Sequence, residues 1–312
     1  MLGFDIGGTK CAVSLGHVEQ GMLIVDEKRS MPTDFSITPY EMIDRMCETA
    51  EQMTKDFSRI GISCGGPLDS RRGVILSPPN LPGWDEVEIV AYLKARYGGR
   101  VSLQNDANAC AIAEWKYGAG RGTKNMVFLT FGTGLGAGLI LDGRLYAGSS
   151  DMAGEVGHVR MAEDGPIGYG KRGSLEGFCS GGGLAQIGRQ IAEEALCRGE
   201  TVSYCKSHEE LAGITAKMLA EYADHGCADA LRAFEICAEK LGLGLSMLID
   251  ILNPDAIVLG SVYVRAEHLL RERILQVIDR EALLQARSVC RILPAGLGES
   301  LGDYAALSVA SE

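Results

Sequence analysis

The stretch GFDIGGTKCAVSL, residues 3–15, places an acid, two adjacent glycines and a threonine between two apolar segments. The flanking segments, residues 2–4 and 11–15, predict two strands. Glycines between strands permit positive φ and a close approach of the backbone to a ligand. The loop is therefore either an ordinary turn or a cradle whose backbone amides hold phosphate. Taken alone, it does not distinguish the two.

The same pattern returns in the middle of the chain. An apolar segment, residues 126–131, precedes Gly132-Thr133-Gly134-Leu135-Gly136, and a second apolar segment ends at Asp142-Gly143. Asp-Gly between two such runs predicts a tight hairpin. We interpret this echo as two halves that each open with a strand–loop–strand unit, which favours the phosphate interpretation.

Two other nucleotide-binding patterns fit less well. A Walker A loop requires Gly-Lys followed by Ser or Thr, whereas Gly7-Gly8-Thr9-Lys10 has a different order. The run Gly132-x-Gly134-x-x-Ala137 formally fits a dinucleotide-binding pattern. That pattern needs a following helix, and a strand is predicted here instead.

Composition limits the class of protein. The 312 residues are 46% hydrophobic and carry a formal net charge of -11, which argues against a nucleic-acid binder. No apolar run reaches membrane-spanning length, and no N-terminal leader is apparent. Ten scattered cysteines without a C-x-x-C pair indicate a reducing compartment. We therefore expect a cytoplasmic protein without a nucleic-acid or membrane partner.

Predicted strands alternate with predicted helices, which indicates an α/β fold. A capping box at Thr38 with Pro39 and Glu41 predicts a helix running to about residue 55. Further helices are expected over residues 107–117, through most of 184–250, over 269–284 and over 303–310.

Five segments occur in one order along the chain: residues 5–10, 105–109, 131–136, 153–158 and 253–260. Together they resemble the ROK family (repressor, open reading frame, kinase) of the sugar kinase/actin/Hsp70 superfamily. The resemblance implies a two-lobed, ribonuclease H-like α/β fold with a duplicated core. We expect a small lobe of residues 1–117 with 301–312 and a larger lobe of residues 118–300. It further implies an ATP-dependent, glucokinase-like hexose kinase, usually a homodimer.

Asp106 follows a predicted strand and opens a predicted helix. From the local sequence it is equally an N-cap or a general base that accepts a proton from an alcohol. The resemblance implies the second role, with Asp106 deprotonating the 6-hydroxyl of a sugar. Asp5, at the end of the first strand, is placed to hold Mg²⁺ through water.

The resemblance also assigns the remaining site residues. Those expected to contact the sugar are Gly66, Asn80, Asn105, Asp106, Glu155, His158 and Glu176. Those expected to contact ATP are Asp5, Gly7, Gly8, Thr9, Lys10, Gly132, Thr133, Gly134, Gly260 and Ser261.

Two departures from the family pattern bear on this site. The family carries C-x-C-G-x-x-G-C-x-E, in which three cysteines and a histidine hold a structural zinc. Here Ile167, Tyr169 and Ser174 replace the cysteines, so we predict no structural zinc. In addition, Ser261 stands where a second glycine is usual.

Other activities stay open at this point. An N-acetylmannosamine kinase or another N-acetylhexosamine kinase is the nearest alternative to a glucokinase. A non-catalytic sugar sensor is an alternative of a different class, although the chain keeps Asp106 and both glycine loops. A repressor is disfavoured, because the first loop begins at residue 5 and leaves no room for a preceding DNA-binding domain.

Overall fold

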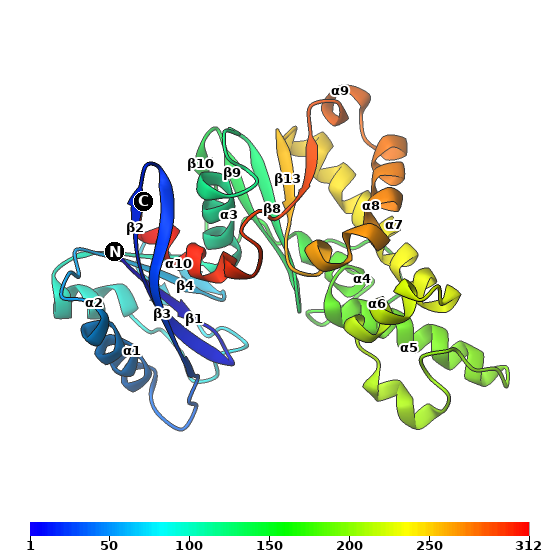
Figure 1. Cartoon of the computed structure of the whole chain (residues 1–312), viewed down its shortest axis with the longest axis horizontal. Helices are drawn as coiled ribbons and strands as arrows, with labels where there is room; N and C mark the ends of the chain where they lie inside the picture. Colours follow the sequence, from blue (N-terminus) through cyan, green and yellow to red (C-terminus); the bar gives the residue numbers. More distant parts are fainter. Residues whose placement is uncertain (312) are drawn as a thin grey trace. The chain divides into compact units, whose positions relative to one another are not determined.

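A computed structural model describes residues 1–311, which form two compact units (Figure 1). Unit 1 comprises Met1–Lys124, Gly138–Ala153 and the chain from Gly296 onward, and unit 2 comprises Asn125–Ala137 and Gly154–Ala295. The lobes expected from the sequence, residues 1–117 with 301–312 and residues 118–300, stay a prediction.

Unit 1 is built on a five-stranded sheet of order β3-β2-β1-β4-β7. The strands β1, β2 and β3 form an antiparallel meander, whereas β4 and β7 run parallel to β1. Because the carboxyl ends of parallel strands meet at one edge, β1, β4 and β7 deliver their following loops to the same place. The bounds are β1 (Leu2–Ile6), β2 (Lys10–Glu19), β3 (Met22–Pro32), β4 (Arg59–Cys64) and β7 (Arg100–Asn105).

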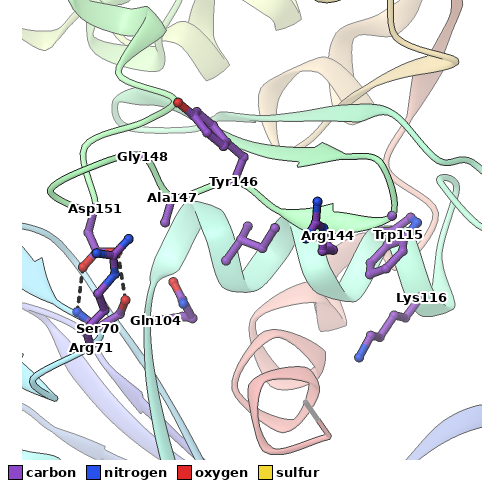
Figure 2. Close-up of a pocket in the computed structure, with 12 residues that line it drawn as sticks. Ser70, Arg71, Gln104, Trp115, Lys116, Arg144, Tyr146, Ala147, Gly148 and Asp151 are labelled. Atoms are coloured by element: carbon purple, nitrogen blue, oxygen red, sulfur yellow. Dashed lines mark hydrogen bonds between the residues drawn. The ribbon is translucent and has the colours of Figure 1, made fainter.

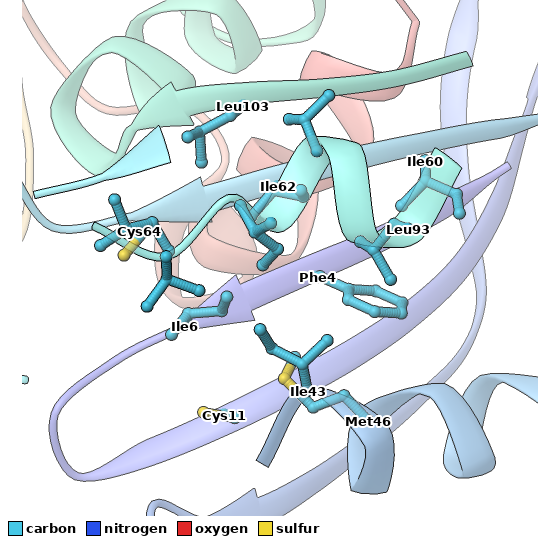
Figure 3. Close-up of a cluster of buried hydrophobic side chains, with 14 of the residues drawn as sticks. Phe4, Ile6, Cys11, Ile43, Met46, Ile60, Ile62, Cys64, Leu93 and Leu103 are labelled. Carbon is cyan, nitrogen blue, oxygen red and sulfur yellow. The ribbon is translucent and has the colours of Figure 1, made fainter. Parts of the chain in front are cut away.

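Two helices cover one face of this sheet. Helix α1 (Pro39–Met53) begins with the predicted capping box at Thr38, and α2 (Ile89–Tyr97) ends at a left-handed Gly98. Side chains from both helices and from β1, β4 and β7 form one buried apolar cluster (Figure 3). Labelled members include Phe4, Ile43, Met46, Ile62 and Leu93.

The opposite face of the sheet carries α10 (Leu301–Ala310), with α3 (Asp106–Tyr117) packed beside it. Alternation along a strand points Gly3 and Gly61 away from the apolar cluster and toward α10. A Cβ on Gly61 would lie only 2.1 Å from the carbonyl oxygen of Ala306. These glycines therefore let the C-terminal helix lie directly on β1 and β4.

A second five-stranded sheet has the order β10-β9-β8-β13-β14. A hairpin partner again lies beside the first strand, and two parallel strands follow, so the core is duplicated as predicted. Asp142 and Gly143 both have positive φ, 51° and 71°, and form the predicted hairpin turn. The bounds are β8 (Met126–Phe131), β9 (Leu135–Leu141), β10 (Arg144–Leu145), β13 (Ala256–Leu259) and β14 (Arg291–Pro294).

Helices dominate the rest of unit 2, as expected for residues 184–250. The helix predicted from residue 269 begins earlier, at Val262. The bounds are α4 (Leu175–Phe178), α5 (Gly181–Cys197), α6 (Ala216–Asp224), α7 (Ala228–Leu252), α8 (Val262–Glu281) and α9 (Leu284–Arg287). Residues 1–311 also contain two small hairpins and three 3-10 turns. The hairpins are β5/β6 (Leu68–Asp69 and Val74–Ile75) and β11/β12 (Ile167–Gly168 and Lys171–Arg172). Within residues 1–311 we find no helix with the length and apolar character that a membrane span requires.

Candidate functional site

The first glycine loop, Gly7–Thr9, joins β1 to β2, and hydrogen bonds with Lys10 and Thr33 hold it. The amide of Gly7 donates to the carbonyl of Lys10 at 3.2 Å, and the Thr33 hydroxyl donates to the carbonyl of Gly7 at 2.5 Å. The Thr33 amide also donates to the carbonyl of Thr9 at 3.1 Å. The amides of Gly8 and Thr9 have no hydrogen-bond partner among residues 1–311. The loop therefore presents two backbone donors, as a phosphate cradle requires.

Close packing, and not a left-handed backbone, explains the glycines of this loop. Neither Gly7 nor Gly8 has a positive φ, so the expectation based on conformational freedom was wrong. A Cβ on Gly8 would instead lie 2.3 Å from the carbonyl oxygen of Asn80. Asn80 also borders Gly65, and Gly66 borders the Asn105 amide, where added Cβ atoms would lie 3.2 and 3.1 Å away. The structure thus gathers these predicted sugar-side residues near the first glycine loop.

The N-cap alternative for Asp106 is wrong, because Asn105 occupies that position. The Asn105 side chain accepts a hydrogen bond from the Ala107 amide at 3.0 Å. Asp106 is the first helical residue, and its carboxylate accepts from the same amide at 2.8 Å. The Asp106 side chain stays open to solvent, yet desolvation by the surrounding protein raises its pKa. A raised pKa suits a carboxylate that must accept a proton near neutral pH.

A second carboxylate reaches the same edge from β1. Burial, then the charges of Asp106 and Asp303, raise the pKa of Asp5 to about 6. Asp303 lies in the first turn of α10 and forms an ion pair with Lys28. The sequence carried no signal for Asp303, because it reaches Asp5 only through the packing of α10 on the sheet.

These acids fit hydrated Mg²⁺ better than a fully protein-bound metal. No group of three or more His, Cys, Asp or Glu in the part of the chain described here is arranged to hold a metal ion. Mg²⁺ commonly keeps several waters and takes one or two carboxylates together with phosphate oxygens. The repulsion that raises the pKa of Asp5 would be relieved by a divalent cation.

The second glycine loop, Gly132–Gly134, joins β8 to β9 in unit 2. The Gly132 amide donates to the Gly134 carbonyl at 3.0 Å, and Gly181 at the start of α5 donates to the Gly132 carbonyl at 2.8 Å. The amides of Thr133 and Gly134 have no partner among the residues described. This loop therefore offers the same pair of donors as the first. The strand β9 follows this loop, as predicted, and not the helix that a dinucleotide-binding pattern needs.

The three predicted sugar ligands of unit 2 lie around this second loop. Glu176, in α4, accepts a hydrogen bond from the Leu135 amide at 2.9 Å. Glu155 and His158 bracket a 3-10 turn in which a Cβ on Gly157 would lie 2.1 Å from the Leu135 carbonyl oxygen. The exposed His158 ring lies edge-on to Tyr169, with 6.5 Å between the ring centroids. Carboxylates and an imidazole in this arrangement suit directional hydrogen bonds to sugar hydroxyls.

Ser261 also borders the second loop. It begins α8 directly after Gly260, whose amide donates to the Leu129 carbonyl at 3.0 Å. A Cβ on Gly132 would lie 3.6 Å from the Ser261 hydroxyl oxygen. Ser261 has φ 52° and ψ -107°, a conformation that favours glycine.

The β11/β12 hairpin does not fit a tetrahedral zinc site. Ile167 has no ligating atom, and the Tyr169 side chain is 72% exposed. The buried Ser174 hydroxyl is engaged as the N-cap of α4, where it accepts from the Gly177 amide at 3.1 Å. Gln186 binds the hairpin instead, because it both donates to the carbonyl and accepts from the amide of Ile167, each at 2.9 Å. Side-chain hydrogen bonds from Gln186 and Ser174 thus support this loop.

The fold and site define a two-unit α/β protein with a strand–glycine loop–strand hairpin in each sheet, flanked by carboxylates in both units and an imidazole in unit 2. A family model described as the ROK family matches residues 1–312, and the chain belongs to the ROK family. A glucokinase from Streptomyces coelicolor is 31% identical over 315 residues, covering 100% of this chain and 97% of that protein.

Solved structures agree with the predicted fold class. The crystal structure of a ROK family glucokinase from Streptomyces griseus, in complex with glucose and AMPPNP, has a TM-score of 0.75 and 29% identity. The match covers 100% of this chain and 99% of that one, so the predicted two-lobed α/β fold is confirmed. The xylose repressor of Bacillus subtilis is also similar, at 25% identity over 96% of this chain and 73% of the repressor.

Proposed function

We propose that this protein is an ATP-dependent sugar kinase that phosphorylates the 6-hydroxyl of a hexose, with glucose as the first candidate. The observation that carries the proposal is that Asp106 lies near enough to Asp5, in β1 just before the first glycine loop, to raise its pKa, while Asn105 instead caps the helix that Asp106 begins. The full-length similarity to glucokinases, one of them crystallised with glucose and an ATP analogue, supports it.

In the proposed reaction, Asp106 accepts the proton of the sugar 6-hydroxyl as its oxygen attacks the γ-phosphorus and ADP leaves. Phosphoryl transfer depends mainly on positioning and charge stabilisation, so one base and oriented donors suffice from the protein. The free amides of Gly8, Thr9, Thr133 and Gly134 would bind phosphate oxygens. Bound Mg²⁺, held by Asp5 through water, would neutralise charge on those oxygens.

In unit 1, Asn105 and Asn80 would orient the sugar. In unit 2, Glu155, His158 and Glu176 would bind the ring hydroxyls, and Gly260 with Ser261 would border the adenosine. An N-acetylhexosamine kinase uses the same chemistry on a sugar that differs at C2, and we keep it as the second candidate. A cytoplasmic homodimer without structural zinc stays our prediction for the assembled protein.

The test is an ADP-release assay on the full chain with ATP, Mg²⁺ and a panel of sugars. The panel holds glucose, fructose, allose, N-acetylglucosamine and N-acetylmannosamine, with 6-deoxyglucose as the matched control. We expect stimulation by one or a few sugars and none by 6-deoxyglucose, which lacks the accepting hydroxyl but should compete with glucose. Sugar binding by calorimetry without any stimulated ADP release would instead identify a sugar sensor.

A further inference from the structure

A cavity of about 700 Å³ lies within unit 1 and includes none of the residues assigned to sugar or ATP (Figure 2). Its walls come from the C-terminal part of α3, from the β9–β10 hairpin with the segment after it, and from the turn that follows β5. The lining residues used below are Arg71, Gln104, Trp115, Lys116, Arg144 and Tyr146.

The charge of this cavity is opposite to that of the whole chain. Arg71, Lys116 and Arg144 line it from three separate segments, although the protein carries a net charge of -11. The one acidic lining residue is Asp151, whose carboxylate accepts hydrogen bonds from the amide and hydroxyl of Ser70 at 2.7 and 2.8 Å. Within residues 1–311, neither Arg71 nor Arg144 forms an ion pair. Two arginines without an ion-pair partner among these residues therefore line the cavity, together with one carboxylate.

A smaller cavity of about 250 Å³ adjoins it and shares Arg71, Gln104 and Leu145 as lining residues. It adds the exposed side chain of Lys94, from α2, as a further cation. Arg71 thus borders both spaces, and the positive surface continues from one to the other. The available volume suits a small organic anion better than a single ion.

Aromatic side chains accompany these cations. The Trp115 indole nitrogen donates to the Thr123 carbonyl at 2.9 Å, which fixes the ring at the cavity wall. Tyr146, in the segment after β10, also lines the cavity and is 52% exposed. Tryptophan and tyrosine rings pack well against the carbon skeleton of a ligand, and arginine forks match the geometry of phosphate.

We propose that this cavity binds a small phosphate ester, with Arg71 and Arg144 as the essential cations and Trp115 against the carbon part. Arginine binds phosphate with paired, charge-assisted hydrogen bonds, which are about twice as strong as neutral ones. The proposal does not depend on the function of the glycine loops, because none of the lining residues belongs to them.

Trp115 provides a local reporter. The only other tryptophan, Trp84, is 3% exposed and lies in the apolar cluster of unit 1. We would titrate the full chain with inorganic phosphate and with glucose 6-phosphate, at constant ionic strength, and follow tryptophan fluorescence and binding heat. We expect saturable binding, with the fluorescence change lost in Trp115→Phe.

Substitutions then locate the binding. Arg71→Gln and Arg144→Gln should each weaken the affinity about tenfold or more, the usual effect of losing a hydrogen bond to a charged group. Arg72→Gln is the matched control. It removes the same charge at the next residue in the chain, whose side chain is exposed and does not line the cavity. Tighter binding of glucose 6-phosphate than of inorganic phosphate would support an ester as the ligand, whereas equal binding would overturn the ester in favour of phosphate alone. Absence of binding heat with both ligands, or equal losses in Arg72→Gln, would overturn the proposal.

Discussion

The two glycine loops of this protein present the same pair of free amides but are held in different ways. In the first loop, Gly8 lies against the Asn80 carbonyl, and the amide and hydroxyl of Thr33 bind two carbonyls of the loop. The second loop rests on a helix terminus at Gly181 and on one side chain, Glu176. A Cβ added at Gly8 would therefore meet backbone, whereas a Cβ added at Gly134 would meet the Glu176 carboxylate.

The charged groups near the two loops also differ. Asp5 and Asp106 adjoin the first loop, where the proposed proton transfer requires positions fixed to fractions of an ångström. Glu176 adjoins the second loop and is also a proposed sugar ligand, so binding of sugar and the shape of that loop are linked through one carboxylate.

The largest effect is expected from Asp106→Asn. Asparagine keeps the size and the hydrogen bond from the Ala107 amide but cannot accept the proton. General-base catalysis contributes roughly 10²- to 10⁴-fold, so kcat should fall by about that factor while sugar affinity changes little. Single-turnover phosphorylation and sugar calorimetry on the same variant measure the two quantities. Turnover near that of the unmodified chain would show that Asp106 is not the base.

Matched alanine substitutions separate the two loops by how they are packed. In Gly8→Ala the new Cβ meets a backbone carbonyl 2.3 Å away, and overpacking of this kind costs roughly 1–3 kcal/mol. In Gly134→Ala the new Cβ meets only the Glu176 carboxylate, 2.7 Å away, which can swing aside. We expect Gly8→Ala to lose more unfolding free energy and more ATP affinity, and Gly134→Ala to lose mainly sugar affinity.

Gly132→Ala is the control for this pair, because its nearest neighbour would lie at an ordinary 3.6 Å. Urea denaturation and calorimetry with AMPPNP and glucose provide the measurements. Equal losses in Gly8→Ala and Gly134→Ala would contradict the contrast between a glycine packed against a backbone carbonyl and one packed against a side chain.

The acid beside the first loop predicts a pH-dependent stability. The pKa of Asp5 is raised from 3.8 to about 6 by burial and by Asp106 and Asp303, against the opposing charges of Lys28 and Lys10. Between about pH 4 and 6 the unfolded chain therefore binds fewer protons than the folded one, and stability falls as pH rises. At about 1.4 kcal/mol per pKa unit, the loss is up to about 3 kcal/mol.

Asp5→Asn cannot ionise, so it should be more stable than the unmodified chain at pH 7.5 and equal to it below about pH 4. Denaturation curves at these two pH values test the difference. A variant no more stable at pH 7.5 would show that the carboxylate of Asp5 is not destabilised by its neighbours.

How much was predictable differs between the loops for physical reasons. Both hairpins follow from local pattern, and the capping box at Thr38 fixed the start of α1. The role of Asp303 did not follow, because it depends on α10 lying against Gly3 and Gly61, a contact between the two ends of the chain. Excluding Asp106 as the N-cap also needed the structure, since Asn105 and Asp106 are both good caps. Of the two reasons expected for the loop glycines, positive φ was wrong for Gly7 and Gly8. The Asn80 carbonyl that crowds Gly8 could not be predicted from the sequence, because the two are distant in the chain.

The fourth prediction concerns the β11/β12 hairpin, where Ile167 and Tyr169 stand in place of expected cysteines. Gly168 of this hairpin packs against Glu176, and Gln186 holds the neighbouring Ile167 through two hydrogen bonds. Gln186→Leu should therefore raise the KM for sugar several-fold to about tenfold, with kcat little changed, because each lost hydrogen bond is worth about 1 kcal/mol. A zinc chelator should change neither the activity nor the melting temperature. Inactivation by the chelator, reversed by Zn²⁺, would show that a metal supports this loop after all.

The smallest effect is expected where the chain departs from the family glycine beside the second loop. Ser261 holds a φ of 52° with ψ of -107°, and a residue with a side chain in such a conformation costs on the order of 1–3 kcal/mol. Ser261→Gly removes that cost but also the hydrogen bond that Arg265 donates to the Ser261 hydroxyl, worth about 1 kcal/mol. We therefore expect a net gain of about 1 kcal/mol in urea denaturation, with Ser261→Ala, which loses the hydroxyl but keeps the strain, as control. Glycine no more stable than alanine would mean that the second loop, like the first, is limited by packing and not by backbone conformation.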